Sequence, residues 1–367
     1  MFNKAQINVL VVDDSAFIRK AVSLMLESDP GIRVIDFARD GQEAVEKVAC
    51  IKPDLVTMDI EMPKMDGLTA LSKIMKENPT PVLMLSSITN EGAKATMDAF
   101  DLGAVDFIPK QISEVSMDIV KVKELLIDKV KQIHSRRRTL MAQYALGRRM
   151  NMNAGAHSAT KPLADEPAQL AAIKLRRRGI RVVAIGVSTG GPPALQKIIP
   201  KLPEDFPSGI LVVQHMPPRF TRSLADRLDS ISSLKVKEAE HGEPIVAGCV
   251  YIAPGDKHLK VKKWGNNADV RLDDEPSDLL HRPSVDVMMD SVAEAYGGAS
   301  LAVILTGMGS DGLQGITHLK GKGAAVIAQN EQTCVVYGMP RAVAEKGLAD
   351  RISPIDRIAR DIVSYFS

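Results

Sequence analysis

The sequence has few cysteines, few aromatic residues and no long apolar run. Its three cysteines, Cys50, Cys249 and Cys334, lie far apart and form no CxxC pair. This excludes a disulfide framework and a thiolate metal site, and we expect all three to be buried as small apolar residues. The longest apolar runs, such as 301–305, are far shorter than the roughly 20 residues that span a bilayer. Because the N-terminus also lacks the apolar core of a signal peptide, we expect a cytoplasmic protein.

Positive and negative charges nearly cancel over the whole chain, but they are unevenly distributed along the sequence. The net charge is +2 over 367 residues, yet the segment from His134 to Arg181 holds 11 Lys and Arg against 2 Asp and Glu, a local +9 that leaves −7 for the rest. This segment is poor in branched apolar residues and rich in Ala, Gly, Asn and Ser, which is typical of a flexible linker. Its arginine clusters are also compatible with a nucleic-acid or membrane patch. We favour a solubilising role and contacts with acidic domain faces.

Two alternating patterns of strands and helices flank this linker. Before it, apolar strand-like segments alternate with amphipathic helices, and these segments are 7–14, 33–38, 54–59, 81–87 and 105–110. After it come the strand-like segments 181–187, 209–215, 249–254, 301–307 and 324–329, with a predicted hairpin over 259–274. Both patterns predict doubly wound α/β domains, the first with a five-stranded parallel sheet and the second mostly parallel with an inserted hairpin. We therefore predict a domain over residues 1–130, a linker over 131–178 and a second domain over 179–367.

Polar side chains follow the strands of the first domain, at Asp13, Asp14, Asp59, Ser86 and Lys110. The carboxyl ends of parallel strands meet in one crevice, so we expect these side chains to be neighbours. Crowded carboxylates suit a hard cation such as Mg²⁺, and a lysine and a hydroxyl beside them would orient a phosphoryl group on an aspartate. Taken singly, each aspartate could instead be a turn residue or a helix cap.

The motifs that carry these residues resemble the receiver domain of bacterial response regulators. They are VLVVDDS, DLVTMDIEMPKMDGL, PVLMLSS and VDFIPK in this order, and the resemblance extends over residues 7–130. The resemblance implies that Asp59 is the phosphoacceptor. It also implies a Mg²⁺ site formed by Asp13, Asp14, Asp59 and the backbone carbonyl of Glu61. Ser86 is then the switch hydroxyl and Lys110 the partner of the phosphoryl group. Gln111 departs from the proline that many receivers carry after this lysine, which leaves the local loop geometry open.

The turn AIGVSTGGPP, residues 184–193, is compatible with two kinds of site. Gly186-Val187-Ser188-Thr189-Gly190 follows an apolar strand and precedes two prolines that suit a first helical turn, as in a nucleophile elbow. The alternative is a phosphate-binding turn of the GxGxxG type. Ser188 weakens it, because it replaces the glycine that lets the backbone approach a pyrophosphate. The acidic residues 204–205 also lie before the second strand rather than after it.

His215 and Asp311 favour the nucleophile, because they also follow apolar strands. With Ser188 they would supply a nucleophile, a base and a residue that orients the base. Each could instead be a cap or a loop residue, and Asp286, at the start of a predicted helix, is a rival orienter. The chain order Ser, His, Asp differs from that of α/β-hydrolases.

The second domain looks like the chemotaxis protein-glutamate methylesterase family, through AIGVSTGGP, VVQHMP, YIAPGDKHL, HRPSVD and LTGMGSDG over residues 181 to about 365. The resemblance implies hydrolysis of glutamate γ-methyl esters on chemoreceptors and deamidation of receptor glutamines, with no cofactor for the esterase reaction. It implies an oxyanion hole from the backbone N–H groups of Thr189, Gly190 and Met308. His241, His258 and His281 are candidates to line the substrate cleft.

The implied partners are methyl-accepting chemoreceptors as substrate and the chemotaxis histidine kinase as phosphodonor. The resemblance also implies that the receiver covers the active site until Asp59 is phosphorylated. We expect a monomer with no nucleic acid and no membrane insertion. Two alternatives remain: a receiver joined to a DNA-binding effector, suggested by the basic linker, and a receiver joined to a nucleotide-binding module. The first fits poorly, because a second domain of about 187 residues exceeds a helix-turn-helix effector.

Overall fold

The computed structural model describes residues 6–110, 118–142, 144, 179–265 and 267–366. The chain divides into two compact units, Met1–Ala159 and Thr160–Ser367, and each is described by itself. Among the described residues, no helix is both long and apolar enough to cross a membrane. The predicted linker lies outside the described residues from 145 to 178. The boundaries of the three predicted segments therefore stay a prediction.

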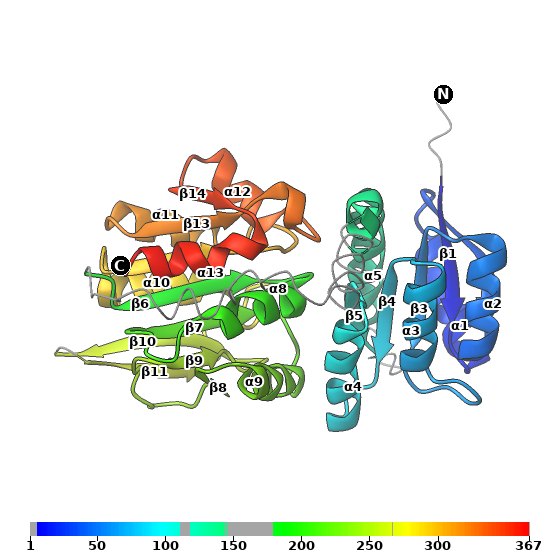
Figure 1. Ribbon diagram of the computed structural model, residues 1–367, viewed down its shortest axis with the longest axis horizontal. Coiled ribbons are helices and arrows are strands. Elements are labelled where there is room, and N and C mark those ends of the chain that lie inside the picture. The colour runs from blue at the N-terminus through cyan, green and yellow to red at the C-terminus, as the bar shows by residue number, and fades with distance from the viewer. Residues whose placement is uncertain (1–5, 111–117, 143, 145–178, 266, 367) are drawn as a thin grey trace, which may run out of the picture. The chain divides into compact units, whose positions relative to one another are not determined.

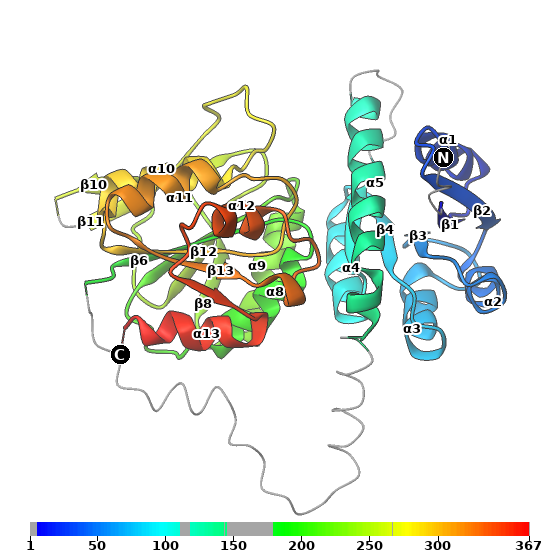
Figure 2. The same ribbon diagram turned by 90° about the horizontal axis from the view of Figure 1, so that it is seen from above.

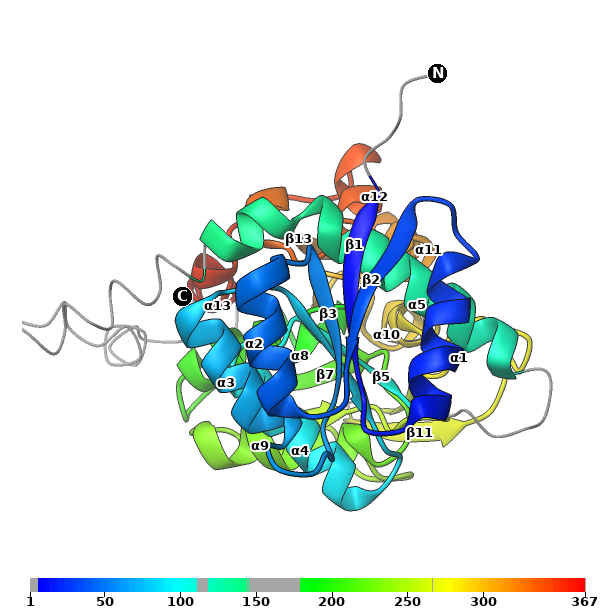
Figure 3. The same cartoon turned by 90° about the vertical axis from the view of Figure 1, so that its right-hand side faces the viewer.

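The first unit is a parallel sheet with helices on both faces (Figure 1). The strand order is β2-β1-β3-β4-β5, with β1 (Ile7–Val12), β2 (Ile32–Ala38), β3 (Leu55–Asp59), β4 (Val82–Ser86) and β5 (Asp106–Pro109). The helices are α1 (Ala16–Glu27), α2 (Gly41–Ile51), α3 (Gly67–Glu77), α4 (Asn90–Asp101) and α5 (Asp118–Ser135). Figure 3 shows α1 and α5 on one side of this sheet and α2, α3 and α4 on the other. The predicted five-stranded doubly wound sheet is confirmed.

Short polar residues fix where the first four helices begin. The side chains of Ser15, Asp40, Asp66 and Thr89 each accept a hydrogen bond from a backbone N–H three residues later. Such N-caps satisfy donors that the first helical turn would otherwise leave free. Each cap follows the carboxyl end of a strand, so the polar residues of the sheet edge stand in ordered turns.

The second unit contains a seven-stranded sheet in which every pairing is parallel. Its order is β14-β13-β12-β6-β7-β9-β8, with β6 (Val182–Val187), β7 (Gly209–Gln214), β8 (Lys235–Glu238), β9 (Cys249–Ile252), β12 (Ser300–Ile304), β13 (Ala325–Gln329) and β14 (Arg351–Ser353). The helices are α8 (Gly191–Ile198), α9 (Phe220–Ile231), α10 (Val285–Tyr296), α11 (Leu313–Gly321), α12 (Met339–Glu345) and α13 (Ile355–Ser364), with short 3-10 turns at Ile199–Lys201 and Glu331–Thr333. Figure 2 shows α10, α11 and α12 on one face and α8, α9 and α13 on the other.

Three neighbouring central strands, β7, β6 and β12, position the site of this unit. Every residue of the three is buried, as expected for parallel strands covered on both faces. Gly186 of β6 pairs with Val213 of β7 and with Ile304 of β12. Because the three strands end level, the residues that follow them meet at one edge of the sheet.

Some expectations need correction. The hairpin is present as β10 (His258–Trp264) and β11 (Asn267–Asp273), but it forms a separate antiparallel sheet that packs on α10 instead of joining the parallel strands. The sequence did not predict the edge strands β8 and β14, which are only four and three residues long. Cys249 and Cys334 are buried as expected, but Cys50 is exposed.

Candidate functional site

The acidic residues of the first unit meet at the carboxyl edge of its sheet. One carboxylate oxygen from each of Asp13, Asp14 and Asp59 lies within 4.8 Å of the others. Lys110 Nζ lies 2.8 Å from Asp13 Oδ2 and 2.7 Å from Asp59 Oδ2. Asp13 and Asp59 are buried, whereas Asp14 is exposed. The structure thus brings together four of the side chains that the sequence singled out.

The charges of this cluster are unbalanced toward the negative. Burial raises the pKa of Asp59, and the ion pair with Lys110 opposes that rise while the charge of Asp13 adds to it. Burial alone would lower the pKa of Lys110, but its contacts with Asp13 and Asp59 outweigh burial and raise it, so the lysine stays charged. One ammonium faces three carboxylates, and an all-oxygen donor set of this kind fits a divalent cation such as Mg²⁺.

Ser86 and Glu61 adjoin the cluster from two other directions. The buried Ser86 hydroxyl donates to Gly92 O at 3.0 Å and accepts from Thr96 Oγ1 at 2.9 Å, so it is engaged by α4. A backbone hydrogen bond from Glu61 reaches the Asp59 carboxylate. Metal binding by the Glu61 carbonyl stays a prediction, and Gln111 lies outside the described residues.

Ser188, His215 and Asp311 meet at the carboxyl edge of the second sheet. Ser188 directly follows β6, and its backbone N–H donates to Thr306 O at 3.0 Å in the segment after β12. His215 directly follows β7, and its backbone N–H donates to Val187 O at 3.2 Å. His215 Nε2 lies 2.7 Å from Asp311 Oδ2. Residues far apart in sequence thus form one cluster.

Asp311 is held by the start of α10. Its carboxylate accepts hydrogen bonds from Ser284 Oγ at 2.9 Å, Val285 N at 2.7 Å and Asp286 N at 2.9 Å. Burial would raise the pKa of Asp311, but the hydrogen bond and charge of His215, together with these backbone donors, hold it well below its usual range. Helix N-termini favour negative charge, so Asp311 is a fixed carboxylate beside the imidazole.

Asp286, the rival orienter, lies behind Asp311. Its Oδ1 accepts from Gly315 N at 2.8 Å. Burial raises the pKa of Asp286 to about 6; the Gly315 bond lowers it and the charge of Asp311 raises it further. Asp311 is therefore the carboxylate that contacts His215, whereas Asp286 contacts Asp311 and Gly315.

The orientation of His215 was not predictable from the sequence. Because Nε2 faces Asp311, Nδ1 is the ring nitrogen left for proton transfer, and it is buried without a hydrogen-bond partner among the described residues. His281 stacks on the His215 ring with centroids 4.1 Å apart and an interplanar angle of 20°. Burial, and then the charge of His215, lower the pKa of His281 to about 4, so His281 is neutral at neutral pH.

The turn after β6 and the loop after β12 lie side by side. A Cβ added to Gly307 would lie 2.8 Å from Ser188 Cβ. Gln214 Nε2, at the end of β7, donates to Ser188 O at 3.0 Å and to His215 O at 3.2 Å, which fixes the turn after β6 to the turn after β7. Over the described part of the chain, no acceptor takes the backbone N–H groups of Thr189, Gly190 and Met308. These are the three groups predicted for the oxyanion hole.

Three features of the site were not predicted from the sequence: the contacts of Ser284, those of Gln214 and the stacking of His281. Ser284 had a usable signal, because it precedes an apolar helical pattern as N-cap residues do. It is the N-cap of α10. Of the three histidines proposed to line a cleft, His258 is fully buried and His241 is exposed beside Leu272.

Comparisons with known proteins show which kind of domain each half of the chain resembles. Residues 183–362 match the family model described as CheB methylesterase, and residues 9–120 match the response regulator receiver domain. A protein-glutamate methylesterase/protein-glutamine glutaminase of Oleidesulfovibrio alaskensis is 51% identical over 365 residues, covering 98% of this chain and 99% of the relative. Another from Nitratidesulfovibrio vulgaris is 51% identical over 363 residues, with 98% and 99% covered. The crystal structure of the Thermotoga maritima CheB methylesterase catalytic domain is 50% identical, with a TM-score of 0.50, covering 50% of this chain and 98% of that chain.

Proposed function

Because the chain belongs to the CheB methylesterase family, we propose that Ser188, His215 and Asp311 carry out the family's reaction as a serine hydrolase. The chain acts in chemotaxis as a methylesterase and glutaminase: it hydrolyses glutamate γ-methyl esters of chemoreceptors to methanol and carboxylate, and it deamidates receptor glutamines. The mechanism rests on one observation above all, the 2.7 Å contact between His215 Nε2 and Asp311 Oδ2 at the strand ends beside Ser188.

The proposed reaction has two steps. Ser188 Oγ attacks the ester carbonyl carbon while His215 Nδ1 accepts the hydroxyl proton, and Asp311 stabilises the imidazolium that forms. The tetrahedral intermediate collapses, and His215 returns the proton to the departing methoxide oxygen, which leaves as methanol. A water molecule, deprotonated by His215, then attacks the acyl-enzyme, which releases the glutamate carboxylate and restores Ser188. With a glutamine substrate the leaving group is ammonia.

The backbone N–H groups of Thr189, Gly190 and Met308 are the proposed donors to the oxyanion. They have no acceptor among the described residues, so they are available to the negative oxygen of the tetrahedral intermediate. Loss of one such donor typically raises the barrier by about 3 kcal/mol. Asp286 has no direct part in this scheme, because Asp311 is the carboxylate that contacts His215.

The first unit is the proposed control element. Phosphorylation of a receiver usually depends on Mg²⁺, and Asp13, Asp14 and Asp59 would hold the ion, which supplies charge neutralisation to the phosphoryl oxygens when it is bound. We place the phosphoryl group on Asp59, donated by the chemotaxis histidine kinase, with Lys110 and Ser86 as its partners. Phosphorylation then shifts the chain from a covered to an open active site. The family assignment replaces the DNA-binding and nucleotide-binding alternatives, since residues 183–362 match a methylesterase.

Substitution of the nucleophile tests this proposal. Ser188→Ala should lower the rate of methanol release from methylated receptor membranes by at least about 10³-fold, as loss of a serine nucleophile does elsewhere. Ser230→Ala, an exposed serine of α9, is the matched control and should keep the parent rate. Equal thermal unfolding of both variants would show that the fold is intact. Full methanol release by Ser188→Ala would refute the assignment.

A further inference from the structure

The loop between β11 and α10 carries an apolar tip next to the site. Leu279 is 42% exposed and Leu280 is 86% exposed, the highest value among the large apolar side chains that the structure describes. The next residue, His281, stacks on His215. The exposed leucine pair thus directly precedes in sequence the histidine that stacks on His215, the proposed base.

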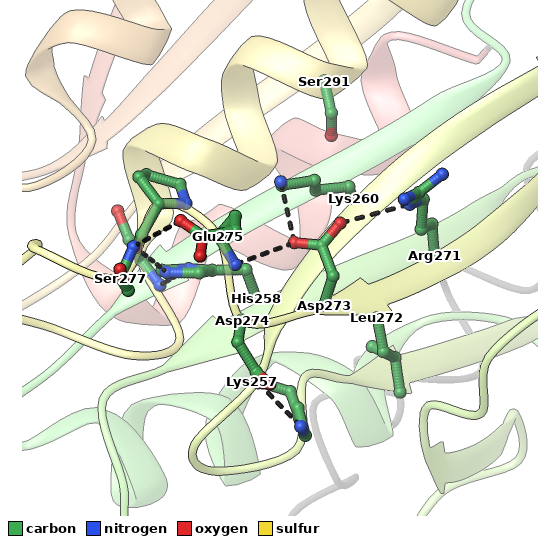
Figure 4. A network of polar contacts seen from close by, with 12 residues as sticks. Lys257, His258, Lys260, Arg271, Leu272, Asp273, Asp274, Glu275, Ser277 and Ser291 are labelled. Atoms are coloured by element: carbon green, nitrogen blue, oxygen red, sulfur yellow. Dashed lines mark hydrogen bonds and ion pairs between the residues drawn. The ribbon is translucent and has the colours of Figure 1, made fainter.

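Ion pairs and backbone hydrogen bonds fix the start of this loop (Figure 4). Lys260 Nζ lies 2.8 Å from Asp273 Oδ1, and Lys257 Nζ lies 2.7 Å from Asp274 Oδ1. Glu275 N donates to Asp273 Oδ1 at 3.2 Å, and Ser277 N donates to Glu275 Oε2 at 3.1 Å. The chain is thus ordered up to the residues just before the tip.

His258 ties the start of the loop to its end. The buried imidazole donates from Nε2 to Pro276 O at 3.1 Å and accepts at Nδ1 from Ser284 N at 3.2 Å. Burial lowers the pKa of His258, which keeps Nδ1 free to accept. Arg282 Nη2 also donates to Ser277 O at 3.2 Å across the loop. These contacts hold both ends of the loop, while Leu280 at its tip is 86% exposed and Leu279 is partly exposed.

We propose that Leu279 and Leu280 bind apolar side chains of the receptor helix that carries the modified glutamate. This inference rests on the proposed function. Under the proposed function the substrate is a glutamate side chain of a receptor protein, so the receptor backbone must pass close to the site, and the leucine tip is joined to His281 at that site. An amphipathic helix presents apolar side chains one turn apart, which suits two adjacent leucines on a loop held at both ends.

The test compares two substrates for the full-length chain treated with a phosphodonor. One is methylated receptor membrane, and the other is a short soluble peptide with one glutamate methyl ester, too short to reach the tip. The double variant Leu279→Ser/Leu280→Ser should raise the KM for the receptor about tenfold and lower the receptor-to-peptide ratio of kcat/KM by the same factor. Ile352→Ser, which removes another exposed apolar residue of this unit, should keep the parent ratio.

Three outcomes would overturn the inference while the parent still releases methanol. They are unchanged kcat/KM values on both substrates, an equal loss of kcat/KM on both substrates, and a faster unphosphorylated enzyme with an unchanged receptor KM. The second outcome would mean that the leucines only support the site, and the third that this chain's own receiver covers them. A parent chain that releases no methanol from either substrate would instead refute the proposed function, and the inference with it.

Discussion

Asp311 and Asp286 are adjacent carboxylates whose pKa values move in opposite directions. Asp311 faces His215 and the first N–H groups of α10, and its pKa lies well below its usual range. Asp286 is half-buried behind it, and burial, together with the charge of Asp311, raises the pKa of Asp286 to about 6. Neighbouring carboxylates separate in this way when only one of them is held by several hydrogen-bond donors, here the His215 ring and the N–H groups of α10.

Conservative substitutions distinguish the two roles. Asp311→Asn removes the charge that stabilises the imidazolium, and we expect kcat for methanol release to fall by about 10³- to 10⁴-fold. Asp286→Asn keeps an oxygen to accept the Gly315 N–H and removes a repelling charge, so its kcat should stay within about tenfold of the parent. The reverse result would make Asp286 the orienting residue.

The same residues predict how stability depends on pH. Asp286 has a folded pKa of about 6, above its ordinary 3.8. Its stabilising contribution to the free energy of unfolding is therefore fully present below pH 3.8 and is lost as pH rises through 6. His281 has a folded pKa of about 4, below its ordinary 6.5, so its contribution is present above pH 6.5 and is lost as pH falls through 4. Relative to the parent, Asp286→Asn should gain stability as pH rises, and His281→Phe as pH falls.

Urea unfolding between pH 4 and 7.5 measures both slopes. The single tryptophan, Trp264, lies in the same unit, so its fluorescence reports on the unfolding of that unit. After discounting for partial solvent exposure, we expect changes of about 1–2 kcal/mol across this range. Stability differences that do not vary with pH would show that neither group titrates as described.

At the scale of elements, the turn between β6 and α8 determines where the nucleophile stands. Gly190 has φ 75°, which side-chain-bearing residues seldom adopt, and a Cβ there would lie 2.4 Å from Val335 Cγ2. Gly190→Ala should destabilise the unit by about 2–4 kcal/mol and reduce kcat, because the backbone strain adds to the clash beside an oxyanion donor.

Gly242→Ala is the matched control for this substitution. Gly242 has φ 82°, but a Cβ there would meet nothing within 4 Å. It should show only the cost of the left-handed conformation, about 1–2 kcal/mol, with kcat unchanged. Equal unfolding midpoints and equal kcat for the two variants would contradict this account of the turn.

The sequence predicted the central strands and the residues that follow them, but not the geometry between those residues. Buried parallel strands are nearly continuous apolar runs, so β6, β7 and β12 were recognisable and Ser188, His215 and Asp311 could be placed at one edge. The edge strands β8 and β14 have too few residues for a pattern. His215 Nε2 faces Asp311, and His281 stacks on His215. Both features depend on packing between distant segments of the chain, which no local sequence pattern encodes.

At the scale of the whole molecule, two separately built sites share one chain. The acidic cluster with Lys110 lies in the first unit, and Ser188, His215 and Asp311 lie in the second. Between them the sequence has the strongly basic segment from His134 to Arg181. The family joins the two sites in one function, so phosphorylation in one unit should be measurable as hydrolysis in the other.

The most direct test is methanol release from methylated receptor membranes by the full chain, with and without a small-molecule phosphodonor and Mg²⁺. The account predicts that the phosphodonor raises the rate of the parent, and that Asp59→Asn keeps the basal rate without this rise. An equal rise in Asp59→Asn, or no rise in the parent, would contradict the claim that Asp59 controls the site at Ser188.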